Sequence, residues 1–224
     1  MARTTIVFDL DGTLVDTAPD LIDTLNIILG REGMPPVPYE QGRVSIGGGA
    51  RAMITRGLAA EGRQVSPAEL DKMFTDFIAH YSAHIADRSR PFPGVERVLE
   101  ALGNGEFILA VCTNKLEGLS RQLLDTLGLS RHFAAICGQD TFAVQKPDPI
   151  ILRRTIETAG GDAKTAIMVG DSATDVLTAR AAGVPVIGVD FGYTEKPISE
   201  FGPDCVISHF DELQALIGSM TRRA

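Results

Sequence analysis

The stretch Asp9-Leu10-Asp11-Gly12-Thr13-Leu14-Val15-Asp16 directly follows the short apolar run Thr4–Phe8. The run is brief and rich in β-branched residues, which predicts a buried strand with the aspartates at its C-terminal end. Asp9 and Asp11 are two positions apart, so an extended chain points both side chains the same way, and Gly12 then allows a sharp turn. Because ligands bind at this edge of open α/β sheets, both aspartates are candidate catalytic groups.

Two carboxylates this close repel each other, which raises the pKa of one of them unless a metal cation offsets the charge. The pair therefore suits a division of labour between an ionised nucleophile, Asp9, and a proton donor, Asp11. A lone aspartate at a strand end is usually only a turn residue. Three further motifs argue against that simpler interpretation here.

Two of these motifs suit phosphate. Thr113 and Asn114 follow an apolar run and precede a helical pattern, so a hydroxyl and free backbone amides meet at a helix start. Helix capping is the alternative role for Thr113. Lys146, in Lys146-Pro147-Asp148-Pro149, supplies a fixed positive charge for a transferring phosphoryl group, unless it is a solvated surface lysine.

The last motif is Val169-Gly170-Asp171-Ser172-Ala173-Thr174-Asp175. Asp171 falls at another predicted strand end, and Asp175 lies about one turn into the next helix. Carboxylates of this kind suit Mg²⁺, which is the predicted cofactor. Asp175 could also be a first-turn acid favoured by the helix dipole, and the two roles are compatible.

Short apolar runs alternate with helical patterns along most of the chain, which predicts a doubly wound, mostly parallel α/β sheet with a Rossmann-like core. Residues 17–90 break this rhythm with helices and no convincing strand. We therefore expect a catalytic core of residues 1–16 and 91–224 and a small α-helical cap of residues 17–90. The predicted strands are Thr4–Phe8, Ile108–Cys112, Ala134–Cys137, Ala166–Val169, Val186–Val189 and Cys205–Ile207.

Composition is that of an ordinary globular chain. Its 224 residues suffice for a core with a smaller domain inserted, and the net charge of −8 favours neither a nucleic-acid nor a membrane partner. The sequence shows no signal peptide and no run long enough to span a bilayer. The three widely spaced cysteines indicate reduced thiols. We expect a cytoplasmic monomer or small homo-oligomer.

The four motifs, in this order, resemble those of the haloacid dehalogenase superfamily, and the resemblance covers essentially the whole chain. Within it, the sequence is most similar to the phosphoglycolate phosphatases. The local features that carry this closer likeness are Asp16-Thr17-Ala18-Pro19-Asp20, Ile46-Gly47-Gly48-Gly49-Ala50, Thr113-Asn114-Lys115 and Phe191-Gly192-Tyr193.

The resemblance implies a role for each motif residue. Asp9 would attack phosphorus, and Asp11 would protonate the leaving oxygen and then deprotonate the hydrolytic water. Mg²⁺ would be held by Asp9, by the backbone carbonyl of Asp11 and by Asp171, with Asp175 orienting metal-bound water. The phosphoryl oxygens would be held by Thr113, by the amide of Asn114 and by Lys146.

The sequence leaves two roles open for the cap residues. Gly48, Gly49 and Arg51 either form a flexible turn before a helix or recognise a substrate carboxylate when the cap closes. Lys115 either faces the substrate or starts a solvated helix. The expected reaction is hydrolysis of a small phosphorylated substrate, 2-phosphoglycolate above others. The alternatives are a phosphosugar mutase, a phosphatase for another ester and an inactive binding protein.

Overall fold

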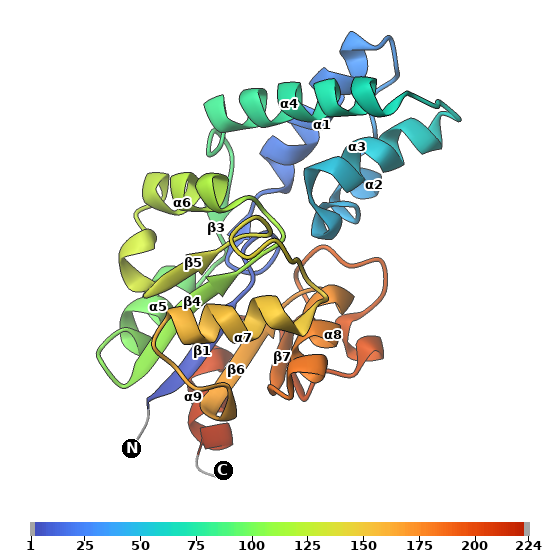
Figure 1. The fold of residues 1–224 in the computed structure, drawn as a ribbon. Coiled ribbons are helices and arrows are strands. Elements are labelled where there is room, and N and C mark those ends of the chain that lie inside the picture. Colours follow the sequence, from blue (N-terminus) through green and yellow to red (C-terminus); the bar gives the residue numbers. More distant parts are fainter. Residues whose placement is uncertain (1–2, 222–224) are drawn as a thin grey trace.

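The computed structural model describes residues 3–221, so the ends of the expected core, residues 1–2 and 222–224, lie outside the described residues. Within that range, a six-stranded parallel sheet forms the centre of the core, in the order β5-β4-β1-β6-β7-β8 (Figure 1). These strands match the predicted ones to within one residue at each end. They are β1 Thr4–Phe8, β4 Phe107–Cys112, β5 Ala135–Cys137, β6 Ala166–Gly170, β7 Val186–Val189 and β8 Cys205–Ile207.

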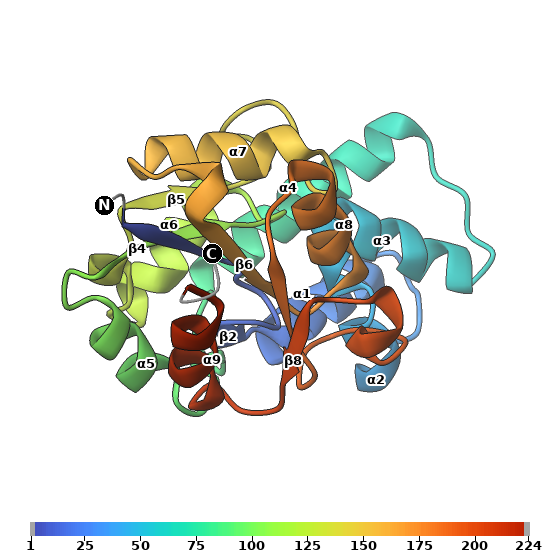
Figure 2. The same cartoon turned by 90° about the horizontal axis from the view of Figure 1, so that it is seen from below.

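Helices cover both faces of this sheet, because alternate strand residues are buried on opposite sides. Ile6 and Phe8 pack in the cluster that contains residues of α5, α6 and α9, whereas Val7 packs with residues of α7 and α8. Figure 2 shows α7 on one side of the sheet and α5 and α9 on the other. The expected doubly wound core is confirmed. The helices are α5 Val95–Leu102, α6 Glu117–Thr126, α7 Pro149–Thr158, α8 Ala173–Ala182 and α9 Glu212–Thr221, with short 3₁₀ turns at Ser130–His132, Ala163–Thr165 and Ile198–Phe201.

The remaining helices, called the cap helices below, lie beyond the C-terminal edge of the sheet (Figure 1). They pack on one another through buried apolar side chains such as Leu25, Met53 and Phe77. The helical insertion expected after the first strand is therefore present. The cap helices are α1 Ala18–Arg31, α2 Tyr39–Arg43, α3 Gly49–Ala60 and α4 Pro67–Ala83, with a 3₁₀ turn at Ile46–Gly48.

The chain enters and leaves the cap helices through a two-stranded antiparallel ribbon that the sequence did not predict. Strand β2, Val15–Asp16, pairs with β3, Arg90–Pro91. A two-residue strand shows no periodicity, so no pattern could reveal it. The ribbon therefore places the two connections between the core and the cap helices side by side.

Helices α1 and α4 of the cap begin differently. Ser66 and Glu69 form a capping box at the start of α4. Thr17, at the start of α1, forms no such box, because its hydroxyl donates to Asp11 instead, at 2.8 Å. Asp20 accepts hydrogen bonds from the backbone N–H groups of Arg88, at 3.0 Å, and Ser89, at 2.7 Å. The side chains of Thr17 and Asp20 thus contact residues outside α1 rather than capping that helix.

Among residues 3–221, no helix combines the length and the apolar character needed to cross a membrane.

Candidate active site

Three buried aspartates meet at the C-terminal edge of the sheet. Asp9 follows β1 and Asp171 follows the neighbouring strand β6, while Asp175 lies in the first turn of α8. One carboxylate oxygen from each lies within 4.8 Å of the others. The chain reverses its winding direction between β1 and β6, which is where ligands bind in folds of this kind. The structure therefore brings three of the predicted site residues together.

The carboxylate of Asp171 is held by two donors. One oxygen accepts from the Thr13 hydroxyl, at 3.1 Å, and the other from the Tyr193 backbone N–H, at 2.7 Å. Gly12 makes room beside it: its φ is +84°, and a Cβ there would lie 2.4 Å from an Asp171 oxygen. Glycine is therefore required at position 12 for both its backbone conformation and its size.

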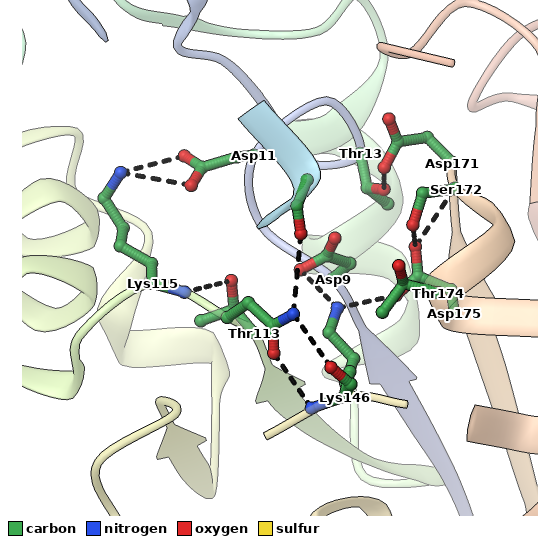
Figure 3. A network of polar contacts seen from close by, with 12 residues as sticks. Asp9, Asp11, Thr13, Thr113, Lys115, Lys146, Asp171, Ser172, Thr174 and Asp175 are labelled. Carbon is green, nitrogen blue, oxygen red and sulfur yellow. Dashed lines mark hydrogen bonds and ion pairs between the residues drawn. The ribbon is translucent and has the colours of Figure 1, made fainter. Parts of the chain in front are cut away.

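Lys146 lies between two of the aspartates (Figure 3). Its Nζ is 2.9 Å from an Asp9 oxygen and 2.6 Å from an Asp175 oxygen, and the residue is only 3% exposed. The second Asp175 oxygen accepts from the backbone N–H and the hydroxyl of Ser172, at 3.1 and 2.7 Å. Both Asp175 oxygens thus already have donors from the protein.

Burial and mutual repulsion set the protonation of this cluster. Burial raises the pKa of Asp9 to about 6, although Lys146 opposes the shift. Burial, together with repulsion from Asp175 and Asp9, raises the pKa of Asp171 to about 8. Burial alone would lower the pKa of Lys146, but Asp175 and Asp9 outweigh it and raise that pKa. The cluster carries more negative charge than its single lysine can offset, so a cation fits here.

Asn114 fixes the loop after β4 to the loop that carries Lys146. Its side-chain oxygen accepts from the Lys146 N–H, at 2.9 Å, and its Nδ2 donates to the Lys146 carbonyl, at 3.1 Å. The same Nδ2 lies 3.4 Å from the carbonyl of Gly47, next to the cap helix α3. The Thr113 hydroxyl accepts from the Lys115 N–H, at 3.2 Å. The predicted phosphate-binding motifs are thus adjacent and held in register.

Asp11 points away from the acidic cluster towards Lys115 (Figure 3). Lys115 Nζ lies 3.0 and 3.1 Å from its two oxygens and also donates to the Tyr81 hydroxyl of α4, at 2.9 Å. Lys115 is 7% exposed, which excludes the solvated helix start that the sequence left open. The lysine joins the core to a cap helix.

The glycine-rich loop of the cap lies against this region. Gly49 lines a small cavity with Asp11 and Lys115, whereas Gly48 and Arg51 line a neighbouring, more open pocket. Arg51 forms an ion pair with Asp71 of α4, at 2.8 Å, and is about half exposed. The substrate contacts expected of these three residues remain a prediction.

Sequence reasoning did not assign a site role to Tyr81 or Tyr193. Tyr81 is one of several apolar positions at helical spacing, and nothing in that pattern shows that its hydroxyl meets Lys115. Tyr193 belongs to the motif Phe191-Gly192-Tyr193, which does not show what its hydroxyl contacts. Its hydroxyl accepts from the Ala18 N–H, at 3.0 Å, and donates to Asp16. The spacing of Ser172 and Asp175, by contrast, is a capping-box signal that could have been recognised.

A family model described as haloacid dehalogenase-like hydrolase matches residues 6–189. The chain belongs to this family. The resemblance inferred from the four motifs is therefore confirmed. Among haloacid dehalogenase-like relatives, a protein of Mesorhizobium japonicum named phosphoglycolate phosphatase is 51% identical, over 100% of this chain and 99% of its own length. One from Agrobacterium fabrum with the same name is 50% identical, over 92% of this chain and 89% of its own.

Comparison of the fold with solved structures indicates the same family. A crystal structure described as a predicted phosphoglycolate phosphatase from Haemophilus somnus superposes with a TM-score of 0.90. It is 29% identical, and the match covers 96% of this chain and 97% of that one. The helical insertion and the core of this haloacid dehalogenase-like hydrolase are thus matched together, over nearly the full chain.

Proposed function

We propose that the protein is a Mg²⁺-dependent phosphatase that hydrolyses 2-phosphoglycolate to glycolate and phosphate through an aspartyl-phosphate on Asp9. The observation that carries the proposal is the buried Asp9 carboxylate, which lies beside Lys146 and within an acidic cluster at the ligand-binding edge of the sheet. The names of the relatives at about half identity support the same substrate.

The donor set suits a magnesium ion. Asp9, Asp171 and the backbone carbonyl of Asp11 would hold it, since hard oxygen ligands are those that Mg²⁺ prefers. Asp175 would act indirectly, because Lys146 and Ser172 already occupy its oxygens. When bound, the ion would supply positive charge that offsets the carboxylates and the phosphoryl oxygens.

The chain's own residues would carry the two chemical steps. In the first, an Asp9 oxygen bonds to phosphorus while the ester P–O bond breaks, and Asp11 gives a proton to the departing oxygen. In the second, Asp11 takes a proton from water, whose oxygen bonds to phosphorus and displaces the Asp9 carboxylate. Thr113, the Asn114 amide and Lys146 would hold the phosphoryl oxygens through both steps.

We further propose that residues 17–90 act as a cap that opens for substrate and closes to exclude water, with residues 1–16 and 91–224 as the catalytic core. The β2–β3 ribbon, where both crossings lie, is the expected hinge.

The test is phosphate release from a panel of small esters, with Mg²⁺ and with EDTA, including 2-phosphoglycolate and hexose phosphates. We expect Mg²⁺-dependent turnover with kcat/KM highest for 2-phosphoglycolate. Asp9→Asn, a nearly isosteric change, should abolish turnover while leaving the circular dichroism spectrum unchanged. Preference for a hexose phosphate would overturn the proposed substrate, and turnover by Asp9→Asn would overturn the assignment of Asp9 as the nucleophile.

A further inference from the structure

A buried lysine faces the small cavity between the core and the cap helices. Lys115 starts the segment that leads into α6, and the cavity is also lined by Asp11, Gly49 and Tyr81. Among the described residues that line this cavity, Lys115 is the one with a positive side chain. Burying an ammonium group is costly, so a lysine here calls for a partner of opposite charge.

The partners of Lys115 are unusual for a structural ion pair. One is Asp11, the proposed proton donor, and the other is the Tyr81 hydroxyl of the cap, whose ring also lies 4.4 Å from Nζ. Lys115 therefore contacts one group proposed to act on the substrate, Asp11, and one group that belongs to the cap, Tyr81. A methionine would fill similar space without the desolvation cost, so packing alone does not explain the lysine.

The position of Lys115 matches the chemistry of the substrate. If Asp11 protonates the ester oxygen, that oxygen lies beside Asp11, and Lys115 Nζ is 3.0 Å from the Asp11 carboxylate. In 2-phosphoglycolate the carboxyl carbon is two bonds from the ester oxygen. A carboxylate so close to Asp11 comes within reach of the Lys115 ammonium.

We infer that Lys115 binds the carboxylate of the substrate and makes the enzyme select phosphorylated acids over neutral phosphate esters. The substrate carboxylate replaces one of the two Asp11 oxygens at the Lys115 ammonium, so Asp11 stays beside the ester oxygen, and Tyr81 keeps the ammonium in position. This inference rests on the proposed phosphatase function and names the residue behind its substrate class. It assigns the carboxylate contact to Lys115 rather than to Arg51, whose charge is already paired with Asp71 on the cap surface.

The unmodified enzyme gives the first test. Its kcat/KM is compared for 2-phosphoglycolate, for the neutral amide of the same compound and for ethyl phosphate. Loss of one charge-assisted contact lowers kcat/KM by about 10- to 100-fold, so we expect the acid to be preferred by at least that factor. Equal rates for the acid and the amide would overturn the inference. No Mg²⁺-dependent turnover of 2-phosphoglycolate would instead overturn the proposed function.

Variants then assign the preference to a residue. Lys115→Met should reduce the acid-to-amide ratio to near one, whereas Lys115→Arg should retain most of it and so show that the charge matters. Because Asp11 serves both substrates, any damage to it lowers both rates and cancels in the ratio. A preserved ratio in Lys115→Met, or a ratio lost in Arg51→Ala alone, would overturn the role of Lys115 and leave the phosphatase intact.

Discussion

Replacement of Lys146 by methionine tests how much of the site's order depends on one buried cation. Lys146 is 3% exposed and lies 2.9 and 2.6 Å from oxygens of Asp9 and Asp175. Removing one partner of a buried ion pair costs about 3–5 kcal/mol, because the remaining charges stay buried and uncompensated. For a chain of this length, each kcal/mol lowers Tm by about 2–4 °C, so the variant should melt about 6–20 °C lower.

The decrease in Tm of Lys146→Met should depend on pH in a defined direction. Lys146 opposes the effect of burial on the pKa of Asp9, so its removal raises that pKa above its present value of about 6. At pH 5 Asp9 is protonated with or without Lys146 and loses no ion pair, whereas at pH 8 the wild-type Asp9 is ionised, so the variant must either bury that charge uncompensated or take up a proton. The difference in Tm between variant and wild type should therefore be larger at pH 8 than at pH 5.

The assay is thermal unfolding of metal-free protein followed by circular dichroism at both pH values. Lys164→Met is the matched control, since Lys164 is exposed and its loss should change stability by no more than about 0.5 kcal/mol. A Lys146→Met variant that melts with the control at both pH values would refute the reasoning, because the lysine would then not be compensating the buried acids.

In Gly12→Ala, a side chain at φ +84° pushes against Asp171, so calorimetric titration should show Mg²⁺ affinity weakened by about 10- to 100-fold; unchanged affinity would remove Asp171 from the metal site. Tyr193→Phe leaves the buried Ala18 N–H without its acceptor and should cost about 1–3 kcal/mol in urea unfolding, and an unchanged midpoint would contradict the contact. In the metal-free protein, burial raises the pKa of Asp9 to about 6 and that of Asp171 to about 8, above the ordinary value of 3.8. Unfolding therefore releases protons, and the free energy of unfolding should fall as pH rises from about 4 to 8. Mg²⁺ should then raise Tm more at pH 8 than at pH 5, and a flat pH profile would show that these acids are not protonated in the fold.

The core of the fold could be predicted because its signals are local. Each strand of the parallel sheet is a short apolar run, and Asp9, Thr113 and Asp171 each directly follow such a run. That Asp9 and Asp171 lie at strand ends follows from that rule, whereas only the strand order in the structure shows that the two strands are neighbours.

What could not be predicted depends on contacts between distant segments. No pattern around Thr17 shows that its hydroxyl turns back to Asp11, and none around Tyr81 shows that it meets a lysine 34 positions later. Arg51 illustrates the same limit. Its sequence context predicts a helix start near substrate, and that contact stays a prediction, but only the fold reveals Asp71 beside the arginine.

The β2–β3 ribbon has a consequence for how such proteins diversify. Because Val15–Asp16 and Arg90–Pro91 are hydrogen-bonded neighbours, everything between them forms a cassette with adjacent ends. The equivalent segment of a relative could replace this one at the β2–β3 ribbon without displacing the strands of the sheet. The graft would have to keep a tyrosine equivalent to Tyr81, because its hydroxyl joins the cassette to Lys115 of the core, whereas Asp16 belongs to the ribbon and its carboxylate accepts from Tyr193 in either case.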